Sequence, residues 1–182
     1  MNNNMLISDL IYKKGDQEMF EVDDKVVYGV VGVCTVSAID TPPIKGVTGD
    51  YYFLQPFFDN RGLIYSPIDN KVPMRRILSK DECDNLRNKA KKCKNDKTLN
   101  EKLPSGKYDE CIKSQDALKL LHLIRFLYNI KNERAKELRK MKSVDNRFLT
   151  TARKLLYGEM AVAMECDVSD ISAEMDQLLS IG

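Results

Sequence analysis

The side chains that could perform chemistry are few and widely scattered in this sequence. Its five cysteines, at positions 34, 83, 93, 111 and 166, show no CxxC spacing, and its single histidine, His122, stands between Leu121 and Leu123 in an apolar stretch. Structural zinc sites draw four Cys or His ligands from closely spaced pairs. We therefore expect no metal site and interpret His122 as a structural residue. Scattered cysteines of this kind suit a reducing compartment.

Catalytic motifs are not found either. The glycines at 29, 32, 46 and 49 do not form a phosphate-binding loop followed by a helix, and no nucleophile elbow, P-loop or HExxH pattern occurs. Glu159 stands out because it lies in a mostly apolar helical stretch. We expect its carboxylate to form hydrogen bonds with a neighbouring element rather than to catalyse a reaction. The sequence thus predicts a protein that is not an enzyme and that uses no cofactor.

Charge is distributed unevenly, although the net charge is only +2. Residues 1–78 carry 8 basic and 10 acidic side chains, residues 79–154 carry 21 basic and 11 acidic ones, and residues 155–182 carry 6 acidic and no basic ones. A concentrated basic block is typical of a surface that binds a polyanion such as nucleic acid. The alternative is that these lysine-rich helices simply present a solvated surface.

The segment 19–78 has the pattern of a small all-β unit. Short runs of β-branched and aromatic residues are separated by glycine, proline and aspartate turns, which favour strands and tight connections. Five short strands with such turns predict a closed barrel of the Tudor or SH3-like kind. The runs are Val26–Tyr28, Val33–Val36, Tyr51–Phe58, Leu63–Ser66 and Met74–Leu78.

The segment 79–182 has the pattern of an all-α bundle. Ser79 and Glu82 match the S-x-x-E capping box and predict a helix that runs to about Cys93. The polar stretch 94–106 predicts a loop, 108–114 a short helix, and Asp116 the start of the longest helix. Ser143 and Asp145 predict the cap of the next helix, and residues 168–181 a last short one. The predicted fold class is α+β, with a leader at 1–18, a barrel at 19–78 and a helical domain at 79–182.

Three separate segments resemble one known family. Residues 20–33 have the pattern F-x-V-x-D-x-V-V-Y-x-x-x-G-V, and residues 152–161 have the pattern A-x-x-L-L-x-x-E-x-A. Ser114-Gln115-Asp116 resembles the S-G-D helix start of the same proteins. Over about residues 19–180 the chain resembles the CarD/CdnL family of bacterial transcription regulators. Its barrel also resembles the RNA-polymerase-interacting domain of the transcription-repair coupling factor.

The resemblance implies a mechanism. In that family the barrel docks on the β subunit of bacterial RNA polymerase, partly by pairing an edge strand with it. The helical domain contacts promoter DNA at the upstream edge of the melted bubble, and binding the open state better than the closed one stabilises the open complex. We therefore expect a cytoplasmic bacterial transcription regulator that acts as a monomer, crosses no membrane and has no small-molecule substrate. The residues expected at the polymerase are Tyr28, Ile44, Lys45, Tyr51, Tyr52 and Tyr65, and those expected at DNA are Lys102, Leu103, Pro104, Lys107, Arg147, Arg153 and Lys154.

The chain also departs from the family. Members typically place a tryptophan in the loop before the long helix, where it wedges into the minor groove, but this chain has no tryptophan. Leu103-Pro104 is the candidate replacement, since Leu and Pro serve as apolar wedges elsewhere; an ordinary loop is the equal alternative. Pro42 or Pro43 stands near the place of an arginine that some members carry on the polymerase-facing strand, so polymerase contacts would depend more on Lys45 and the aromatic residues.

Two further questions stay open at this point. An alternative function is an adaptor whose barrel binds polymerase while its helical domain binds another protein instead of DNA. The leader, residues 1–18, differs from the remainder in composition and is expected to be poorly packed. Met19 is accordingly a second candidate for the native start.

Overall fold

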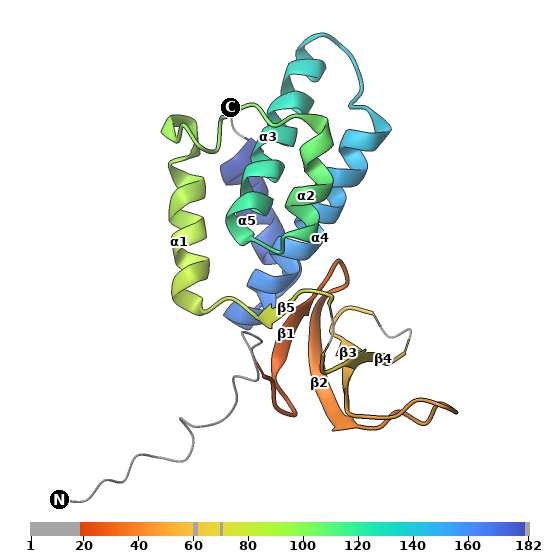
Figure 1. Ribbon diagram of the computed structural model, residues 1–182. Coiled ribbons are helices and arrows are strands. Elements are labelled where there is room, and N and C mark those ends of the chain that lie inside the picture. The colour runs from red at the N-terminus through yellow and green to blue at the C-terminus, as the bar shows by residue number, and fades with distance from the viewer. Residues whose placement is uncertain (1–18, 60–61, 70, 181–182) are drawn as a thin grey trace, which may run out of the picture.

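The computed structural model describes residues 19–59, 62–69 and 71–180 (Figure 1). An antiparallel sheet formed by the N-terminal part of these residues is followed by helices that stack on one side of it (Figure 1). The α+β class predicted from the sequence is thus confirmed in its coarse form. The predicted leader, residues 1–18, lies outside the described residues.

The sheet differs from the prediction in one respect, because it is open. Its strand order is β4-β3-β2-β1-β5, and the two outer strands do not pair with each other within the described residues. The predicted barrel is therefore not closed. Closing a barrel requires strands long enough to tilt and stagger around it, whereas the outer strands have only four and three residues. The strands are β1 (Lys25–Tyr28), β2 (Gly32–Asp40), β3 (Tyr51–Pro56), β4 (Ile64–Pro67) and β5 (Met74–Arg76).

The two faces of the sheet bury different groups, because side chains alternate along a strand. One face carries the small core of the sheet, in which Val26, Cys34 and Leu54 are completely buried. On the opposite face, Val27 of β1 is the register partner of both Val33 in β2 and Arg75 in β5. Directly opposite residues share a face, so these three side chains lie together.

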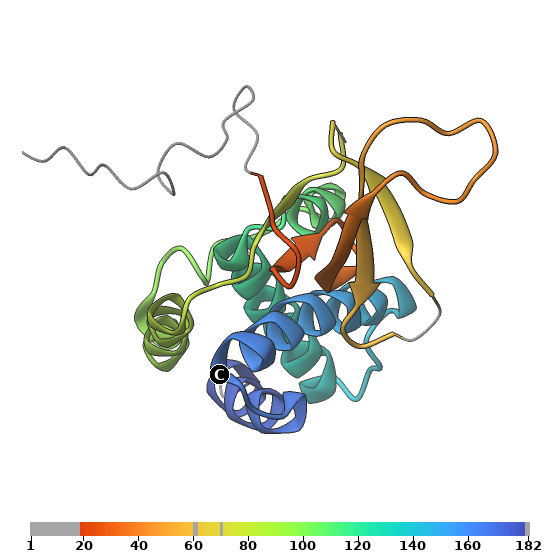
Figure 2. The same cartoon turned by 90° about the horizontal axis from the view of Figure 1, so that it is seen from below.

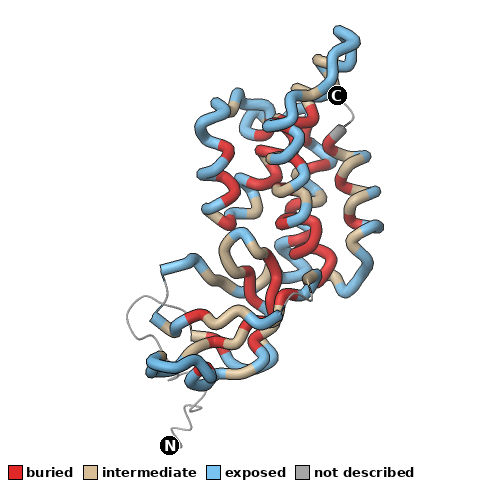
Figure 3. Tube along the Cα trace, turned by 90° about the vertical axis from the view of Figure 1, so that its right-hand side faces the viewer, coloured by how far each residue is buried: buried red, intermediate tan, exposed pale blue. Residues whose placement is uncertain are grey.

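The helices have a separate and larger core. Buried residues run through the centre of the helical part and continue to the place where it meets the sheet (Figure 3). No helix in the described part of the chain is long and apolar enough to cross a membrane. The helical elements are α1 (Lys80–Lys91), the 3-10 turns η2 (Cys93–Asn95) and η3 (Ser105–Lys107), α2 (Tyr108–Lys113), α3 (Ala117–Lys136), α4 (Ser143–Met164) and α5 (Val168–Ser180).

Two of the predicted helix starts are confirmed and one is wrong. Ser79 Oγ accepts from Glu82 N at 3.2 Å and Glu82 Oε2 accepts from Ser79 N at 2.8 Å, which is a complete capping box. These bonds lower the pKa of the Glu82 carboxyl from its ordinary value. Asp116 caps α3 by accepting from Leu118 N at 2.8 Å. Ser143, however, is already the first residue of α4, and Lys142 precedes it without a side-chain cap.

The predicted loop at 94–106 is held firmly against the bundle. Leu99 is only 1% exposed and belongs to the helical core, although it stands in a polar stretch. Asn100 Nδ2 donates to the carbonyl oxygen of Asp96 at 2.9 Å, which closes the loop on itself. His122 Nε2 lies 3.0 Å from the carbonyl oxygen of Glu101, so it ties the loop to α3. This agrees with the structural interpretation of His122.

The burial of the cysteines predicts their reactivity. Burial raises the pKa of the Cys34 and Cys83 thiols to about 11, and Cys93 and Cys111 are also buried, whereas Cys166 is exposed. Because the thiolate is the reactive form, we expect one of the five thiols to react rapidly with a disulfide reagent in the native protein and all five after denaturation. Cys166→Ser should reduce the native count to zero. Two or more rapid thiols in the native protein would contradict the buried positions.

Candidate functional site

An outer aromatic strip lies on the face of the sheet away from the small core. Tyr51 and Phe53 are alternate residues of β3 and share this face, and Tyr65 of β4 lies directly opposite Phe53. The Phe53 and Tyr65 rings meet edge to face with their centroids 4.7 Å apart. All three side chains are half-buried. The structure thus brings together two of the residues predicted at the polymerase and adds Phe53, which the alternation with Tyr51 could have identified.

The strip borders the outer edge of the sheet and an exposed loop. Within the described residues, β4 has a strand neighbour on one side only, namely β3. The loop between β2 and β3 projects away from the helices (Figure 2). This loop carries two further predicted contact residues, Ile44 with 49% of its surface exposed and Lys45, which is also exposed. Pro42, in contrast, is buried at the start of the loop.

The other two residues predicted at the polymerase lie on the core face of the sheet. Tyr52 is only 1% exposed, and its hydroxyl accepts a hydrogen bond from Phe20 N at 3.2 Å. Tyr28 is half-buried and packs against the same cluster. The position of Tyr52 gives no support to a contact through its side chain, because the ring fills the interior of the sheet.

An aromatic cluster joins three helices beside several of the residues predicted at DNA. The Tyr108 ring of α2 meets Phe126 of α3 at 6.3 Å and Phe148 of α4 at 5.2 Å between centroids. The Arg147 guanidinium lies over the Phe148 ring at 5.5 Å. Lys107 directly precedes Tyr108, is exposed and pairs with Glu110 at 3.4 Å. Lys107 and Arg147, 40 positions apart in sequence, thus flank one cluster.

The predicted wedge residues form the wall of a hollow next to this cluster. A hollow of about 520 Å³ is lined by Leu103 and Pro104 on one side and by Phe126 and Ile130 of α3 on the other, with Lys102 at its rim. Leu103 is half-buried and packs against the helical core. In this conformation Pro104 is exposed and Leu103 points back to the protein, so the pair does not project as a wedge.

The remaining two predicted residues on α4 have different surroundings. Arg153 is ion-paired with Asp176 of α5 and lies over the Tyr157 ring at 5.6 Å, so it is engaged within the bundle. Burial raises the pKa of the Tyr157 hydroxyl. Lys154 is exposed and, being seven residues from Arg147, lies about 10 Å further along the helix. Lys154 is therefore available for an external contact, whereas Arg153 is held.

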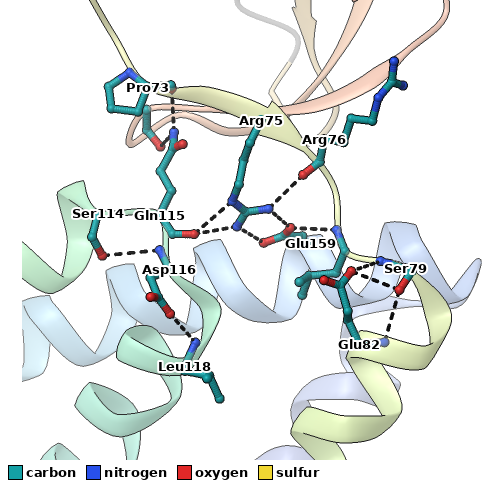
Figure 4. Close-up of polar contacts among 12 residues, drawn as sticks. Pro73, Arg75, Arg76, Ser79, Glu82, Ser114, Gln115, Asp116, Leu118 and Glu159 are labelled. Carbon is teal, nitrogen blue, oxygen red and sulfur yellow. Dashed lines mark hydrogen bonds and ion pairs between the residues drawn. The ribbon is translucent and has the colours of Figure 1, made fainter. Parts of the chain in front are cut away.

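The sheet and the helices meet at a polar junction that the sequence only partly indicated (Figure 4). Arg75 of β5 binds Glu159 of α4 with two parallel contacts, Nη1 to Oε1 at 2.5 Å and Nη2 to Oε2 at 2.9 Å. Glu159 Oε1 also accepts from Leu78 N at 2.9 Å, and its side chain is only 2% exposed. The prediction that Glu159 is hydrogen-bonded to a neighbouring element is confirmed.

Gln115 completes this junction. Its main-chain carbonyl oxygen accepts from Arg75 Nε at 3.0 Å and from Arg75 Nη2 at 2.6 Å. Its side-chain Nε2 donates to the carbonyl oxygens of Pro73 at 2.8 Å and Gly29 at 3.2 Å. Gln115 has a φ of 55°, in the left-handed region, which costs a non-glycine residue about 1 to 2 kcal/mol. Gln115 thus occupies the position of the glycine in the S-G-D pattern, and its hydrogen bonds offset the cost of this backbone conformation. Arg75, Gln115 and Glu159 are hereafter the Arg75 junction.

A comparison with known families identifies the sheet. Residues 20–78, about a third of the chain, match the CarD-like/TRCF RID domain. The resemblance found in the sequence is confirmed for this segment. The match includes every described strand and stops one residue before the Ser79 cap of α1. This domain is a protein-interaction domain rather than a catalytic one, and it suggests a transcription-associated role in binding RNA polymerase.

Proposed function

We propose that this protein is a bacterial transcription regulator that binds the RNA polymerase β subunit through residues 20–78 and promoter DNA through its helices. The observation that carries the proposal is the CarD-like/TRCF RID match over the sheet. The proposed effect is stabilisation of the open complex. The protein would act as a monomer in the cytoplasm, with the segment 79–182 as its DNA-binding domain.

The outer edge of β4 is the proposed polymerase contact. An edge strand can offer backbone donors and acceptors to a partner strand, and neighbouring side chains then select the partner. Here the neighbours are the outer aromatic strip and the exposed Lys45. A short edge gives few hydrogen bonds, so the aromatic rings would supply much of the affinity.

The proposed DNA contact is the basic rim of the Tyr108 cluster. Lys102, Lys107 and Arg147 are exposed around it, and Lys154 extends the rim along α4. Contacts to phosphates need no base-specific geometry. Binding that favours melted over closed DNA would shift the opening equilibrium in proportion to the difference in affinity.

Charge reversal on α4 tests whether DNA and polymerase bind to different surfaces. We expect Arg147→Glu/Lys154→Glu to weaken DNA binding by about tenfold or more and to reduce its salt dependence, because two phosphate contacts become repulsive. Binding to core polymerase should be unchanged. Fluorescence titrations with promoter DNA at several salt concentrations, and with polymerase, measure both quantities.

Two matched variants complete this experiment. Lys71→Glu/Lys80→Glu makes the same change in net charge at exposed positions away from the cluster and should leave DNA binding nearly intact. Phe53→Ala/Tyr65→Ala should weaken polymerase binding and spare DNA binding. Equal loss of both activities in every variant would refute the division of labour.

The hollow beside α3 supports a second candidate function. Its lining by Leu103, Pro104, Phe126 and Ile130 offers an apolar surface that suits a protein partner. An adaptor of this kind would bind polymerase without lengthening the lifetime of the open complex. Promoter-opening assays with the matching polymerase decide between the candidates, because only the DNA-binding regulator changes that lifetime.

A further inference from the structure

The described residues form two separate apolar cores, one in the sheet and one among the helices. The sheet core contains Phe20, Val26 and Tyr52, and the helical core contains residues from Cys83 to Leu179. Separate cores allow two parts of a chain to move against each other unless the boundary is well fixed. The contacts at the boundary therefore decide whether sheet and helices act as one body.

One boundary contact is a close steric fit. The ring of Phe58, which follows β3, lies against α4 so closely that a Cβ added at Gly158 would be 2.9 Å from its Cε2 atom. A Cβ added at Gly32 of β2 would be 3.4 Å from Leu155 Cδ2, an ordinary van der Waals contact. Contacts of this kind hold the two surfaces together, but hydrophobic attraction by itself is non-directional.

The Arg75 junction supplies the direction that these contacts lack. It joins three elements: β5 through Arg75, the turn before α3 through Gln115, and α4 through Glu159 (Figure 4). The planar guanidinium binds the carboxylate through two parallel bonds and a carbonyl through two more, which fixes its orientation. The Gln115 side-chain amide donates to the carbonyl oxygens of Gly29, just after β1, and Pro73, just before β5.

From this geometry we propose that Arg75, Gln115 and Glu159 are positioning residues that hold the helices at one angle to the sheet. This inference rests on the proposed function, because a fixed angle matters only if the sheet binds polymerase while the helices bind DNA. Docking of the sheet on polymerase then places the Tyr108 cluster at one point of the DNA. The junction residues themselves contact neither partner, since Glu159 is buried and Arg75 is occupied by protein groups on every nitrogen.

The first variant is chosen to open the junction without leaving a buried charge. Arg75→Met/Glu159→Gln removes both charges, and the introduced amide oxygen can still accept from Leu78 N. Gln115→Gly is the second variant: it relieves the left-handed strain and removes only the bonds to Gly29 and Pro73. Arg87→Met/Glu174→Gln is the matched control, because it removes an ion pair at 3.0 Å within the helical part.

The experiment measures geometry and function separately. Spin labels at Ser37→Cys in β2 and Lys131→Cys in α3, on a Cys166→Ser background, report the distance between sheet and helices in the full chain. The same junction variants without labels are tested for polymerase binding, DNA binding and open-complex lifetime.

We expect one narrow distance distribution in the parent and the control, a broad one in Arg75→Met/Glu159→Gln, and an intermediate one in Gln115→Gly, which keeps the Arg75 bonds to Glu159 and to the main-chain oxygen of residue 115. Polymerase and DNA affinities should stay at the parent values while the effect on open-complex lifetime is lost, a split that mere destabilisation would not produce. A narrow distribution or an undiminished lifetime effect in folded junction variants overturns the inference and leaves the proposed function standing. A parent that binds no DNA and changes no lifetime overturns the proposed function, and the label distances then still show whether the junction fixes the angle.

Discussion

Glu159→Ala is expected to lower the free energy of unfolding by about 3 kcal/mol, because removing one partner of a buried ion pair leaves the other uncompensated. Arg75 would lose both carboxylate contacts and Leu78 N its acceptor. The estimate is at the lower end of the usual range because 29% of the Arg75 side chain is exposed to water. Urea denaturation followed by helical circular dichroism measures the change.

Glu165→Ala is the control for this variant. Glu165 pairs with Lys80 at 3.1 Å, but both side chains are mostly exposed, and exposed pairs contribute about 1 kcal/mol or less. Glu159→Gln should be intermediate, since it keeps an acceptor for Leu78 N. If Glu159→Ala and Glu165→Ala had the same small effect, the junction would contribute nothing specific to stability.

Tyr52→Ala is expected to unfold much of the sheet, with a loss of about 3 to 5 kcal/mol, because it empties the largest buried position of a small core. Polymerase binding would be lost with it. Tyr52→Phe keeps the ring and removes only the hydroxyl that accepts from Phe20 N, which costs about 1 kcal/mol. Thermal unfolding and polymerase titration of both variants separate the two effects.

The two Tyr52 substitutions also show whether Tyr52 stabilises the sheet from inside or contacts polymerase directly. Polymerase affinity should survive in Tyr52→Phe if the residue acts from inside the sheet. Loss of affinity in Tyr52→Phe at unchanged stability would instead show that Tyr52 touches the partner, as the sequence predicted. Tyr65→Phe, at a half-buried position on the opposite face of the sheet, is the corresponding control.

Local signals in the sequence predicted local structure well. The Ser79 capping box and the Asp116 cap are each complete within four residues, so the atoms that form them are visible in a short window. The family resemblance at residues 20–33 likewise found the RID domain. For Glu159 the sequence indicated a hydrogen-bonding role because a lone carboxylate in an apolar helix must be satisfied.

Features that depend on distant residues were not predictable in the same way. The partner of Glu159 is Arg75, 84 positions earlier, and no local pattern connects them. Leu99 looked like part of a polar loop, yet a single apolar residue can anchor a loop to a core built by other segments. The closed barrel was inferred from strand number, while closure depends on strand length and stagger, which turn signals do not specify.

The separation of Arg75 from Glu159 has a consequence for synthesis on the ribosome. The sheet emerges first, but the face that carries Val27, Val33 and Arg75 stays uncovered until α4 has been made. At elongation rates of about 5 to 20 residues per second, the separation of 84 positions corresponds to a delay of roughly 4 to 17 s. During that interval the nascent chain exposes the unpaired Arg75 side chain beside apolar strands. Chaperones would therefore have access to this face of the sheet before the helices cover it.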